Sequence, residues 1–555
     1  MLPFSVMRPL HPLVEKILEN RNISNREVFL NPSYHERPNS FLMKDMDRAV
    51  GRVLRAIENK ETIAIWHDYD CDGIPGGSLM ADFFRAIRYP VLSYVPERSE
   101  GYGLNNEGIK KLKEQGASLI ITVDCGITDD EEVAYASTLG VDTIITDHHL
   151  PPAALPKAVA VLNPHRVDCE YPFKDLCGTG VAFKLVEGLI ERGSFSLPKG
   201  FEKWLLDLVA LATVADMVPL VGENRILTHF GLVVLHKGRR PGIKALCGAD
   251  RIPIQSVTED DLAFSIAPKV NAASRMESPT LAFELLTTSS TARAKELALK
   301  LVALNKARKT EGMHIAKEVK RRVEALPTQG NLIVVGHSSW RPSLLGIAAT
   351  SVVETHQKTV CLWGKDGGLI KGSCRSDGSV NIVNLMRGAK EVFADFGGHE
   401  FSGGFSVSEE SIHLLPQALE DALASARSES ADSLRGAREP DGYLSLAEAN
   451  ETAYEALRDL APFGLGNPKP LFRIQARVEK LSRFGAHKEH AKMFLSDDSN
   501  RTAEAISFFM SRAPFRETFE LLSPGDTVTM DASLERSHFA GRKSFRLRIE
   551  SLALA

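Results

Sequence analysis

Long apolar stretches are missing from this chain of 555 residues. The most apolar run, LLDLVALATVA, is interrupted by Asp207 and is shorter than the roughly 18 residues that a membrane span needs. The N-terminal MLPFSVMRPLHPLVEK places prolines and Arg8 where a signal peptide would need an apolar core. We therefore expect a cytoplasmic protein with no membrane-spanning part.

Cysteine and an excess of charge of one sign are also lacking. The seven cysteines are scattered and form no CxxC pair, which favours neither a disulfide framework nor a thiolate zinc site, so we expect reduced thiols. The net charge is only −4, but residues 468–555 carry 15 Lys and Arg against 11 Asp and Glu. An acidic body with a basic tail is compatible with a polyanionic partner near a cation-binding centre.

The order of patterns predicts several domains. The runs TIAIW, PVLSYV, SLIITVD and VDTIITD alternate with helical segments, which indicates an α/β fold with a parallel sheet covered by helices on both faces. A long helical stretch, unbroken or bent, precedes a second α/β unit, and alternating strands from LFRIQARVEKLS onward predict a small β-barrel. The predicted divisions are a helical segment (1–60), an α/β domain (61–290), a connecting helix (291–325), a second α/β domain (326–430), a linker with a helical segment (431–465) and a β-domain (466–555).

The stretch HDYDCDG places Asp68, Asp70 and Asp72 at alternating positions directly after the first buried-type strand. A tight turn, indicated by the following Gly73 and Pro75, would let the three carboxylates converge on one point. An acidic surface loop is the commoner reason for clustered aspartates, but open α/β sheets build their sites at the carboxyl ends of strands. Without compensation such carboxylates would repel each other.

Further acidic and imidazole side chains follow later strands. Asp124 ends SLIITVD, the sequence DHH (Asp147, His148 and His149) ends VDTIITD, and Asp216 follows the apolar LVALATVA. Each aspartate alone is more often a cap or turn residue, but the set favours two Mn²⁺ or Mg²⁺ ions, because these ions prefer carboxylates with one or two imidazoles. Zinc is disfavoured, since cysteine and further histidine ligands are missing.

The motifs HDYDCDG, VDCGIT, TDHHLP and ATVADMVPL resemble the four successive motifs of the DHH phosphoesterase superfamily. PKVNAASRM, SSWRPSLLGIAA, IKGSCRS and FGGHEFSGGFSV resemble the connecting helix and the associated DHHA1 domain of its RecJ family of bacterial single-strand-specific exonucleases. LAPFGLGNPKPLF resembles the entrance to that family's oligonucleotide-binding (OB) barrel. The resemblance covers nearly the whole chain.

The resemblance implies roles for individual residues. The implied metal ligands are Asp68, Asp70, Asp72, Asp124, His148 and Asp216, with Asp68 the least firm of the first three and Asp124 bridging two ions. His149 would contact the scissile phosphate, so the implied catalytic residues are Asp124, His148 and His149. The implied pocket for a terminal 5′-phosphate and the adjoining DNA backbone consists of Arg98, Arg275, Ser373, Arg375 and His399, and guanidinium groups suit that target.

Four positions in three motifs depart from the family pattern. His67 stands where the family has glycine, Ser274 replaces the glycine of NAAGR, and Arg341 and Ser343 alter the WHPG motif. We expect His67 to act as a neighbour of the ligands or a surface residue rather than as a ligand. Arg341 adds a positive charge beside the expected DNA path.

The implied function is metal-dependent 5′-to-3′ degradation of single-stranded DNA to mononucleotides in DNA repair and recombination. The resemblance also implies a monomer that works with a helicase and a single-strand-binding protein. The alternatives are a DHH phosphodiesterase for short oligoribonucleotides or cyclic dinucleotides, an inorganic pyrophosphatase, and a non-enzymatic replication scaffold. The first two lack the third domain, and the last requires lost metal ligands.

Overall fold

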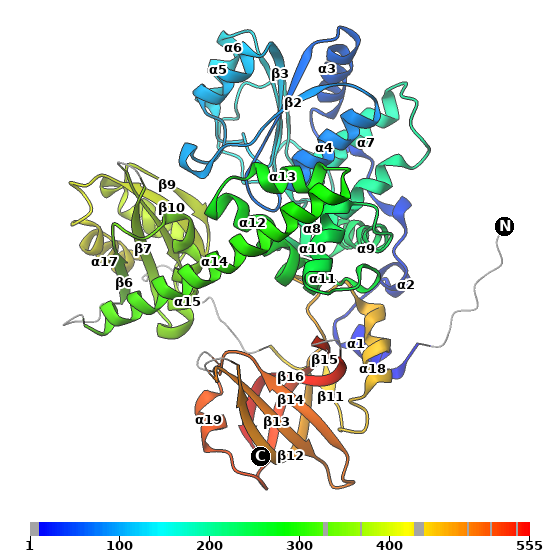
Figure 1. Cartoon of the computed structure of the whole chain (residues 1–555), viewed down its shortest axis with the longest axis vertical. Coiled ribbons are helices and arrows are strands. Elements are labelled where there is room, and N and C mark those ends of the chain that lie inside the picture. Colours follow the sequence, from blue (N-terminus) through cyan, green and yellow to red (C-terminus); the bar gives the residue numbers. More distant parts are fainter. Residues whose placement is uncertain are drawn as a thin grey trace, which may run out of the picture. The chain divides into compact units, whose positions relative to one another are not determined.

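The computed structural model describes residues 10–325, 331–366, 369–426, 438–485, 488–510, 513–539 and 542–555 (Figure 1). The chain divides into two compact units, which are described separately. The first consists of Pro32–His314 and Pro462–Asn467, and the second consists of Met1–Asn31, Ile315–Ala461 and Pro468–Ala555. No helix in the described part of the chain is both long and apolar enough to cross a membrane.

The first unit is built around a parallel sheet with the strand order β2-β1-β3-β4-β5. Its strands are β1 (Thr62–His67), β2 (Val91–Tyr94), β3 (Ala117–Val123), β4 (Asp142–Thr146) and β5 (Ala160–Leu162). Four of them are the predicted strands. The sequence did not predict β5, because three apolar residues after a proline-containing loop are too short a pattern to distinguish from a turn.

Helices cover both faces of this sheet, as predicted (Figure 1). Alternate residues of each strand point to opposite faces. Ala64 and Trp66 pack with α5 (Asn106–Glu114) and α6 (Asp130–Thr138), whereas Ile63 and Ile65 belong to the larger core with the helices on the other face. Those helices are α3 (Met46–Glu58), α4 (Gly73–Ala86) and α7 (Gly178–Arg192).

The rest of the first unit is helical. Its elements are α8 (Leu206–Ala215), α9 (Gly222–His236), α10 (Pro241–Ala249), α11 (Glu259–Asp261), a π-helix (Leu262–Ile266), α12 (Ala267–Met276), α13 (Thr280–Thr287) and the first part of α14 (Thr291–Glu324). The predicted connecting segment is thus one continuous helix, α14. In sequence, α1 (Pro12–Asn20) and α2 (Arg26–Leu30) precede this unit, and both belong to the second unit.

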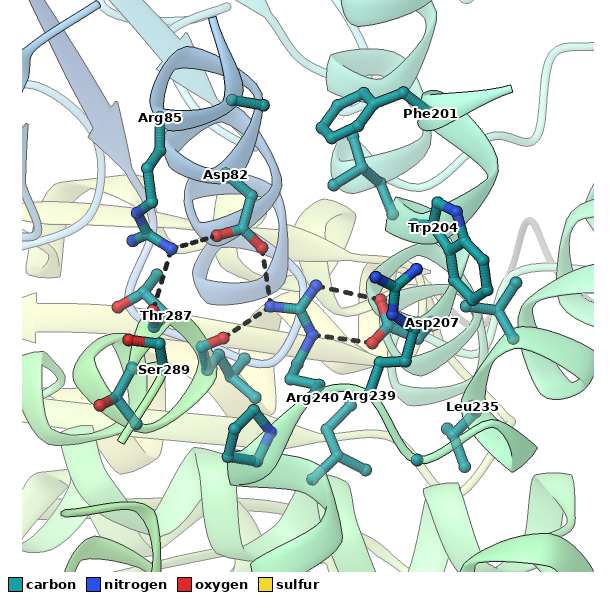
Figure 2. Close-up of a pocket in the computed structure, with 18 of the residues that line it drawn as sticks. Asp82, Arg85, Phe201, Trp204, Asp207, Leu235, Arg239, Arg240, Thr287 and Ser289 are labelled. Carbon is teal, nitrogen blue, oxygen red and sulfur yellow. Dashed lines mark hydrogen bonds and ion pairs between the residues drawn. The ribbon is translucent and has the colours of Figure 1, made fainter. Parts of the chain in front are cut away.

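Arg240 joins the two helices whose ends carry acidic site residues (Figure 2). Its guanidinium donates two hydrogen bonds to Asp207 of α8, at 2.7 and 3.1 Å, and one to Asp82 of α4 at 2.8 Å. The three side chains are largely buried, so each charge has its partner within a poorly solvated environment. This network fixes α4 against α8 and thereby the relative positions of Asp72, which precedes α4, and Asp216, which follows α8.

The second unit contains a mixed five-stranded sheet with the order β6-β7-β8-β10-β9. The strands are β6 (Leu332–Gly336), β7 (Thr359–Asp366), β8 (Leu369–Arg375), β9 (Asp395–His399) and β10 (Ser402–Val407), accompanied by α15 (Pro342–His356), α16 (Ile382–Gly388) and α17 (Leu415–Ala426). Cys361 and Cys374 face each other across β7 and β8 and are joined by a disulfide. The expectation of reduced thiols is wrong for this pair, because the register that opposes them is not visible in their spacing.

The C-terminal residues form a closed five-stranded barrel, so the predicted OB-like domain is confirmed. Its strands are β12 (Phe472–Phe484), β13 (His490–Ser496), β14 (Thr502–Ser507), β15 (Thr527–Phe539) and β16 (Arg542–Leu554). Pairing of β12 with β15 closes the barrel. The elements outside the barrel strands are β11 (Gly442–Tyr443), α18 (Glu451–Leu457) and α19 (Arg516–Leu521). Phe472 is core, whereas Phe494 and Phe509 are exposed. Most of the predicted polar linker, residues 427–437, lies outside the described residues.

Candidate metal centre

The three aspartates that follow β1 do not converge on a single point. Asp70 accepts the backbone N–H groups of Asp72 and Gly73 at 2.7 and 3.3 Å, which folds the segment back at the start of α4. Asp72 is turned the other way and accepts the N–H groups of Gly178 and Thr179 at 2.6 and 2.7 Å, at the N-terminus of α7. The expected single point of convergence is therefore replaced by two.

The glycines after this motif lie in a helix rather than in the expected turn. Helix α4 begins at Gly73, and a side chain there would come within 2.5 Å of the carbonyl oxygen of Asp68. A side chain at Gly77 would meet the ring of His67 at 2.2 Å. The helix starts where its backbone must pass closest to the strand end, and Pro75 is tolerated in its first turn.

Asp124 follows β3 and has a left-handed backbone conformation with φ of 63°. Such a conformation is unfavourable for a residue other than glycine and persists only where the surroundings hold it. The backbone N–H of Asp124 donates to Thr146 of β4 at 2.9 Å, and its carbonyl oxygen accepts the hydroxyl of Tyr102 at 2.8 Å. The carboxylate is buried beneath the ends of the strands.

Asp147 orients the two histidines that follow β4. Its Oδ1 accepts the N–H groups of His148 and His149 at 2.7 and 3.1 Å and lies 2.8 Å from Nδ1 of His149, while Oδ2 accepts the N–H of Ile127 at 3.0 Å. With its oxygens thus engaged, Asp147 is a support for the histidines. The DHH sequence indicates that Asp147 lies at the site, but it does not show that Asp147 binds backbone N–H groups rather than a metal.

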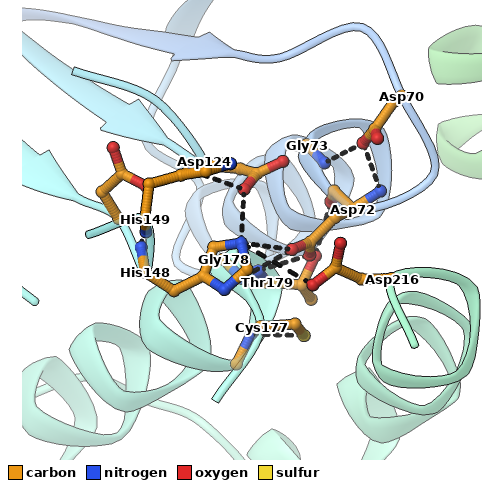
Figure 3. Close-up of polar contacts among 12 residues, drawn as sticks. Asp70, Asp72, Gly73, Asp124, His148, His149, Cys177, Gly178, Thr179 and Asp216 are labelled. Atoms are coloured by element: carbon orange, nitrogen blue, oxygen red, sulfur yellow. Dashed lines mark hydrogen bonds and ion pairs between the residues drawn. The ribbon is translucent and has the colours of Figure 1, made fainter. Parts of the chain in front are cut away.

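His148 lies at the centre of the carboxylates (Figure 3). Its Nε2 is 3.3 Å from Oδ1 of Asp124 and 3.7 Å from an oxygen of both Asp72 and Asp216. Asp216 reaches this point from the end of α8. The structure therefore brings together groups that are up to about 150 residues apart in sequence, counting from Asp68 to Asp216.

Three groups of side chains in the described residues are close enough to share a cation. Within each group the potential ligand atoms lie within 4.8 Å of one another. The groups are Asp68, Asp70 and Asp124; Asp72, His148 and Asp216; and Asp124, His148 and His149. Asp124 belongs to the first group, and its Oδ1 lies 3.3 Å from Nε2 of His148 in the second group. The geometry therefore provides two adjacent positions for cations, with Asp124 between them.

The carboxylates of these groups are difficult to ionise together. Burial, followed by the charge of Asp70, raises the pKa of Asp68 to about 8. Burial and the charge of Asp72 raise the pKa values of Asp124 and Asp216 well above the ordinary range. In contrast, burial opposes ionisation of Asp147, but the hydrogen bonds from His149 and the charges of His149 and His148 together outweigh it, and the pKa of Asp147 is lowered.

The donor set fits divalent cations. Oδ1 of Asp68 and Oδ1 of Asp124 are buried and accept no hydrogen bond from the described residues. Buried carboxylate oxygens are costly without a partner, and clustered ones repel each other. Oxygen ligands with one imidazole match Mn²⁺ and Mg²⁺, and the described groups contain no cysteine ligand, so the residues fit the predicted pair of these ions.

A cationic surface lies in the same unit. Arg98 donates to the hydroxyl of Ser274 at 3.1 Å and stacks 4.1 Å from the ring of Tyr69. Burial, followed by the charges of Arg98 and Arg308, lowers the pKa of Arg275 to about 9, so these two guanidinium groups are the main charges that oppose its ionisation. The sequence did not predict a role for Arg308 on α14, because no recognisable motif surrounds it in that helix.

The remaining predicted anion-binding residues belong to the second unit. Ser373 and Arg375 alternate on β8 and point to the same face, and Nη1 of Arg375 donates to Oγ of Ser373 at 2.8 Å. Burial lowers the pKa of Arg375. His399 ends β9, but its side chain lies outside the described residues.

His67 is buried and is not a surface residue. Its Nδ1 lies 3.0 Å from the carbonyl oxygen of Asp68, and its ring stacks on Phe283 at 5.0 Å. Because burial lowers its pKa to about 4, the neutral ring can donate to that carbonyl. His67 is absent from the three groups of potential ligands in the described residues, which agrees with the expected neighbouring role.

Comparison with known protein families divides the chain into three parts. Residues 62–213 match the DHH family N-terminal domain, residues 329–429 match the DHHA1 domain, and residues 440–551 match the RecJ OB domain. These matches follow the same order as the first sheet, the mixed sheet and the barrel.

Relatives that match along most of the chain carry one name. The single-stranded-DNA-specific exonuclease RecJ of Bacillus subtilis is 32% identical over 99% of this chain and 69% of its own, and that of Escherichia coli is 33% identical over 92% and 90%. The crystal structure of RecJ from Thermus thermophilus in complex with Mn²⁺ superposes with a TM-score of 0.80 at 25% identity, covering 98% of this chain and 76% of the other. The chain therefore belongs to the RecJ family within the DHH phosphoesterases.

Proposed function

We propose that this protein is a metal-dependent exonuclease that degrades single-stranded DNA from the 5′ end to mononucleotides. The observation that carries the proposal is the position of Asp124, which forms a ligand group with Asp68 and Asp70 and lies 3.3 Å from His148 of the neighbouring group, at the carboxyl ends of β1, β3 and β4. The names of the relatives and the Mn²⁺ complex of the Thermus protein support it. A role in DNA repair and recombination follows from such an activity.

The residues of the centre have different proposed roles. Asp68, Asp70, Asp72, Asp124, His148 and Asp216 would hold two Mn²⁺ or Mg²⁺ ions. Such ions, when bound, lower the pKa of a water and stabilise the charge that develops on the phosphate. His149 would donate from Nε2 to a phosphate oxygen in its doubly protonated form: burial opposes that form, but the hydrogen bond and charge of Asp147 raise the pKa of His149 to about 9. The buried backbone bonds of Asp72 and Asp124 keep the carboxylates in position.

The arginines account for the proposed polarity. Arg98, Arg275 and Arg308 form one cationic surface, and Ser373 with Arg375 forms another. We infer that each of these two surfaces, taken by itself, has the chemistry to bind a terminal 5′-phosphate, because guanidinium groups bind phosphate oxygens through two parallel hydrogen bonds. Anchoring that phosphate would present the next linkage to the metal centre and release one nucleotide at a time.

The barrel supports a single-stranded substrate. Exposed Phe494 and Phe509 offer rings on which bases can stack, and Lys492 lies 5.8 Å from the ring of Phe494. Stacking combined with backbone attraction binds single strands with little sequence preference. A compact phosphodiesterase for dinucleotides would have no use for this domain.

We further infer that the protein works in the cytoplasm as a monomer beside a helicase and a single-strand-binding protein. The inference rests on the substrate: an exonuclease that needs a single-stranded end depends on proteins that expose and cover such ends. Size-exclusion chromatography with light scattering would test the monomer.

A degradation assay tests the function. Single and double strands of the same sequence, labelled at either end, are incubated with Mn²⁺, with Mg²⁺ or with chelator. The expected result is release of labelled mononucleotide from the 5′ end of the single strand, in the presence of metal only. Equal degradation of the double strand, or release that begins at the 3′ end, would contradict the proposal.

A further inference from the structure

Tyr102 lies at the metal centre without being one of its predicted residues. It belongs to the loop between a 3₁₀ turn (Arg98–Glu100) and α5. Its hydroxyl donates to the carbonyl oxygen of Asp124 at 2.8 Å, and its oxygen lies 3.1 Å from Nδ1 of His149. The residue is 46% exposed, so the hydroxyl is anchored while part of the ring stays accessible.

The loop that carries Tyr102 is firmly held. Trp66 of β1 donates from its indole to the carbonyl of Gly103 at 3.2 Å, and the N–H of Leu104 donates to Asp129 at 2.7 Å. Gly103 has a φ of 85° and packs so tightly that a side chain there would lie 2.5 Å from the Asp129 carboxylate. The position of the tyrosine hydroxyl is therefore set by the sheet and by the start of α6.

The hydrogen-bond roles around the hydroxyl are consistent with each other. The one phenolic proton is directed at the Asp124 carbonyl, which has no proton to give. The phenolic oxygen can then accept only, and Nδ1–H of His149, shared with Asp147, is the donor within reach. This leaves Nε2 of His149 as the ring nitrogen not engaged by Tyr102 or Asp147.

Two features of the centre depend on this contact. The left-handed backbone of Asp124 requires support, and the Tyr102 hydroxyl holds the carbonyl at that turn. The same hydroxyl restrains the ring of His149. A single side chain thus links the residue between the two ligand groups to the residue proposed to contact phosphate.

We propose that Tyr102 is a positioning residue of the hydrolytic centre, whose hydroxyl fixes the Asp124 turn and the His149 ring together. This inference rests on the proposed metal-dependent hydrolysis. Partners that orient metal ligands typically change metal affinity or activity by about 10- to 100-fold when they are removed. The Tyr102 hydroxyl falls in that class.

Tyr102→Phe is the direct test, because it removes the hydroxyl and keeps the ring. Binding of Mn²⁺ alone is measured by titration calorimetry, and kcat and KM are measured on single-stranded DNA. We expect Mn²⁺ affinity and kcat to fall by about 10- to 100-fold with KM nearly unchanged. Tyr135→Phe, which removes a hydroxyl from α6, is the matched control and should change neither quantity.

Two results would overturn the inference. One is unchanged Mn²⁺ affinity and kcat in Tyr102→Phe, and the other is a raised KM with an unchanged kcat, which would make Tyr102 a substrate contact. Failure of the proposed function is distinguishable, since the unaltered protein would then show no metal-dependent hydrolysis. A thermal midpoint within about 2 °C of the unaltered protein confirms that the variant is folded.

Discussion

Asp124 illustrates how much a single residue contributes to the centre. Its carboxylate belongs to a ligand group with Asp68 and Asp70 and lies 3.3 Å from His148 of the other group. Its raised pKa reflects burial and neighbouring charge, so ionised Asp124 destabilises the fold unless a cation is near. A residue under this constraint serves binding at the expense of stability.

Replacing Asp124 by alanine should abolish most hydrolysis while sparing the fold. We expect activity to fall by more than about 100-fold, because a shared ligand matters more than a partner of a ligand. The midpoint of thermal unfolding without metal should not fall, since a buried like charge is removed. Asp130→Ala, at an exposed position of α6, is the control; near-normal Mn²⁺-dependent activity in Asp124→Ala would refute the bridging role.

Arg375→Ala should weaken the preference for a phosphorylated 5′ end. A charged hydrogen bond contributes about 1.5–3 kcal/mol, so kcat/KM on 5′-phosphorylated DNA should fall by about 10- to 100-fold. The value on 5′-hydroxyl DNA should change little, and so should both values in Arg387→Ala, where the guanidinium is exposed on α16. If the unaltered protein degrades 5′-phosphorylated and 5′-hydroxyl DNA equally well, the proposed phosphate pocket is refuted.

At the scale of elements, the helices around the sheet are joined by buried ion pairs. Glu187 of α7 pairs with Arg37 at 2.6 Å and with Lys184 at 2.7 Å and accepts the hydroxyl of Ser40 at 3.2 Å. Burial opposes ionisation of Glu187, but the charges of Lys184 and Arg37 outweigh it and lower its pKa. Helix α7, whose N-terminus binds Asp72, is thereby fixed to residues 37–40.

Glu187→Gln should destabilise the protein in a pH-dependent manner. Loss of one member of a buried charge network costs about 3 kcal/mol. Because the folded pKa lies below the ordinary value of about 4.3, this contribution is present in full above that pH and disappears as the pH falls through the folded pKa. The urea midpoints of Glu187→Gln and the unaltered protein should therefore differ equally at pH 7 and pH 5.5, and should converge as the pH falls below about 4. A difference between the two proteins that stays the same from pH 7 to below pH 4 would contradict the assignment.

At the scale of the whole molecule, the metal centre belongs to one unit only. All predicted ligands lie within Pro32–His314, whereas the mixed sheet and the barrel form the other unit. Ligands that bind the folded state stabilise the part of the chain that contains the site. The two units should therefore respond differently to metal.

Mn²⁺ should selectively raise the unfolding temperature of the first unit, which contains the metal centre. At a hundredfold excess over Kd the stabilisation is about 2.7 kcal/mol. Differential scanning calorimetry should show one transition that moves upward with Mn²⁺ and returns with chelator, while a second stays in place. In Asp124→Ala the shift should shrink; an equal shift of both transitions would show that the ions bind elsewhere or that the units unfold together.

Much of this organisation can be read from the chain itself. Alternation of apolar runs with helical spacing determined the parallel sheet, and the β-rich tail determined the barrel, because periodicity reports burial directly. The carboxylates and imidazoles at strand ends predicted a metal centre at one edge of the sheet, since parallel strands bring their carboxyl ends to one edge, and the family motifs implied the individual ligands. The family motifs added the arginines.

Other features were decided only by the tertiary structure. The division of Asp68, Asp70 and Asp72 between two groups depends on where α7 offers its backbone N–H groups, and the roles of Tyr102 and Arg308 depend on loops and helices that carry no periodic signal. The pairing of Cys361 with Cys374 depends on strand register. Sequence determines which residues a strand or helix presents, whereas contacts between distant segments depend on packing that no local pattern encodes.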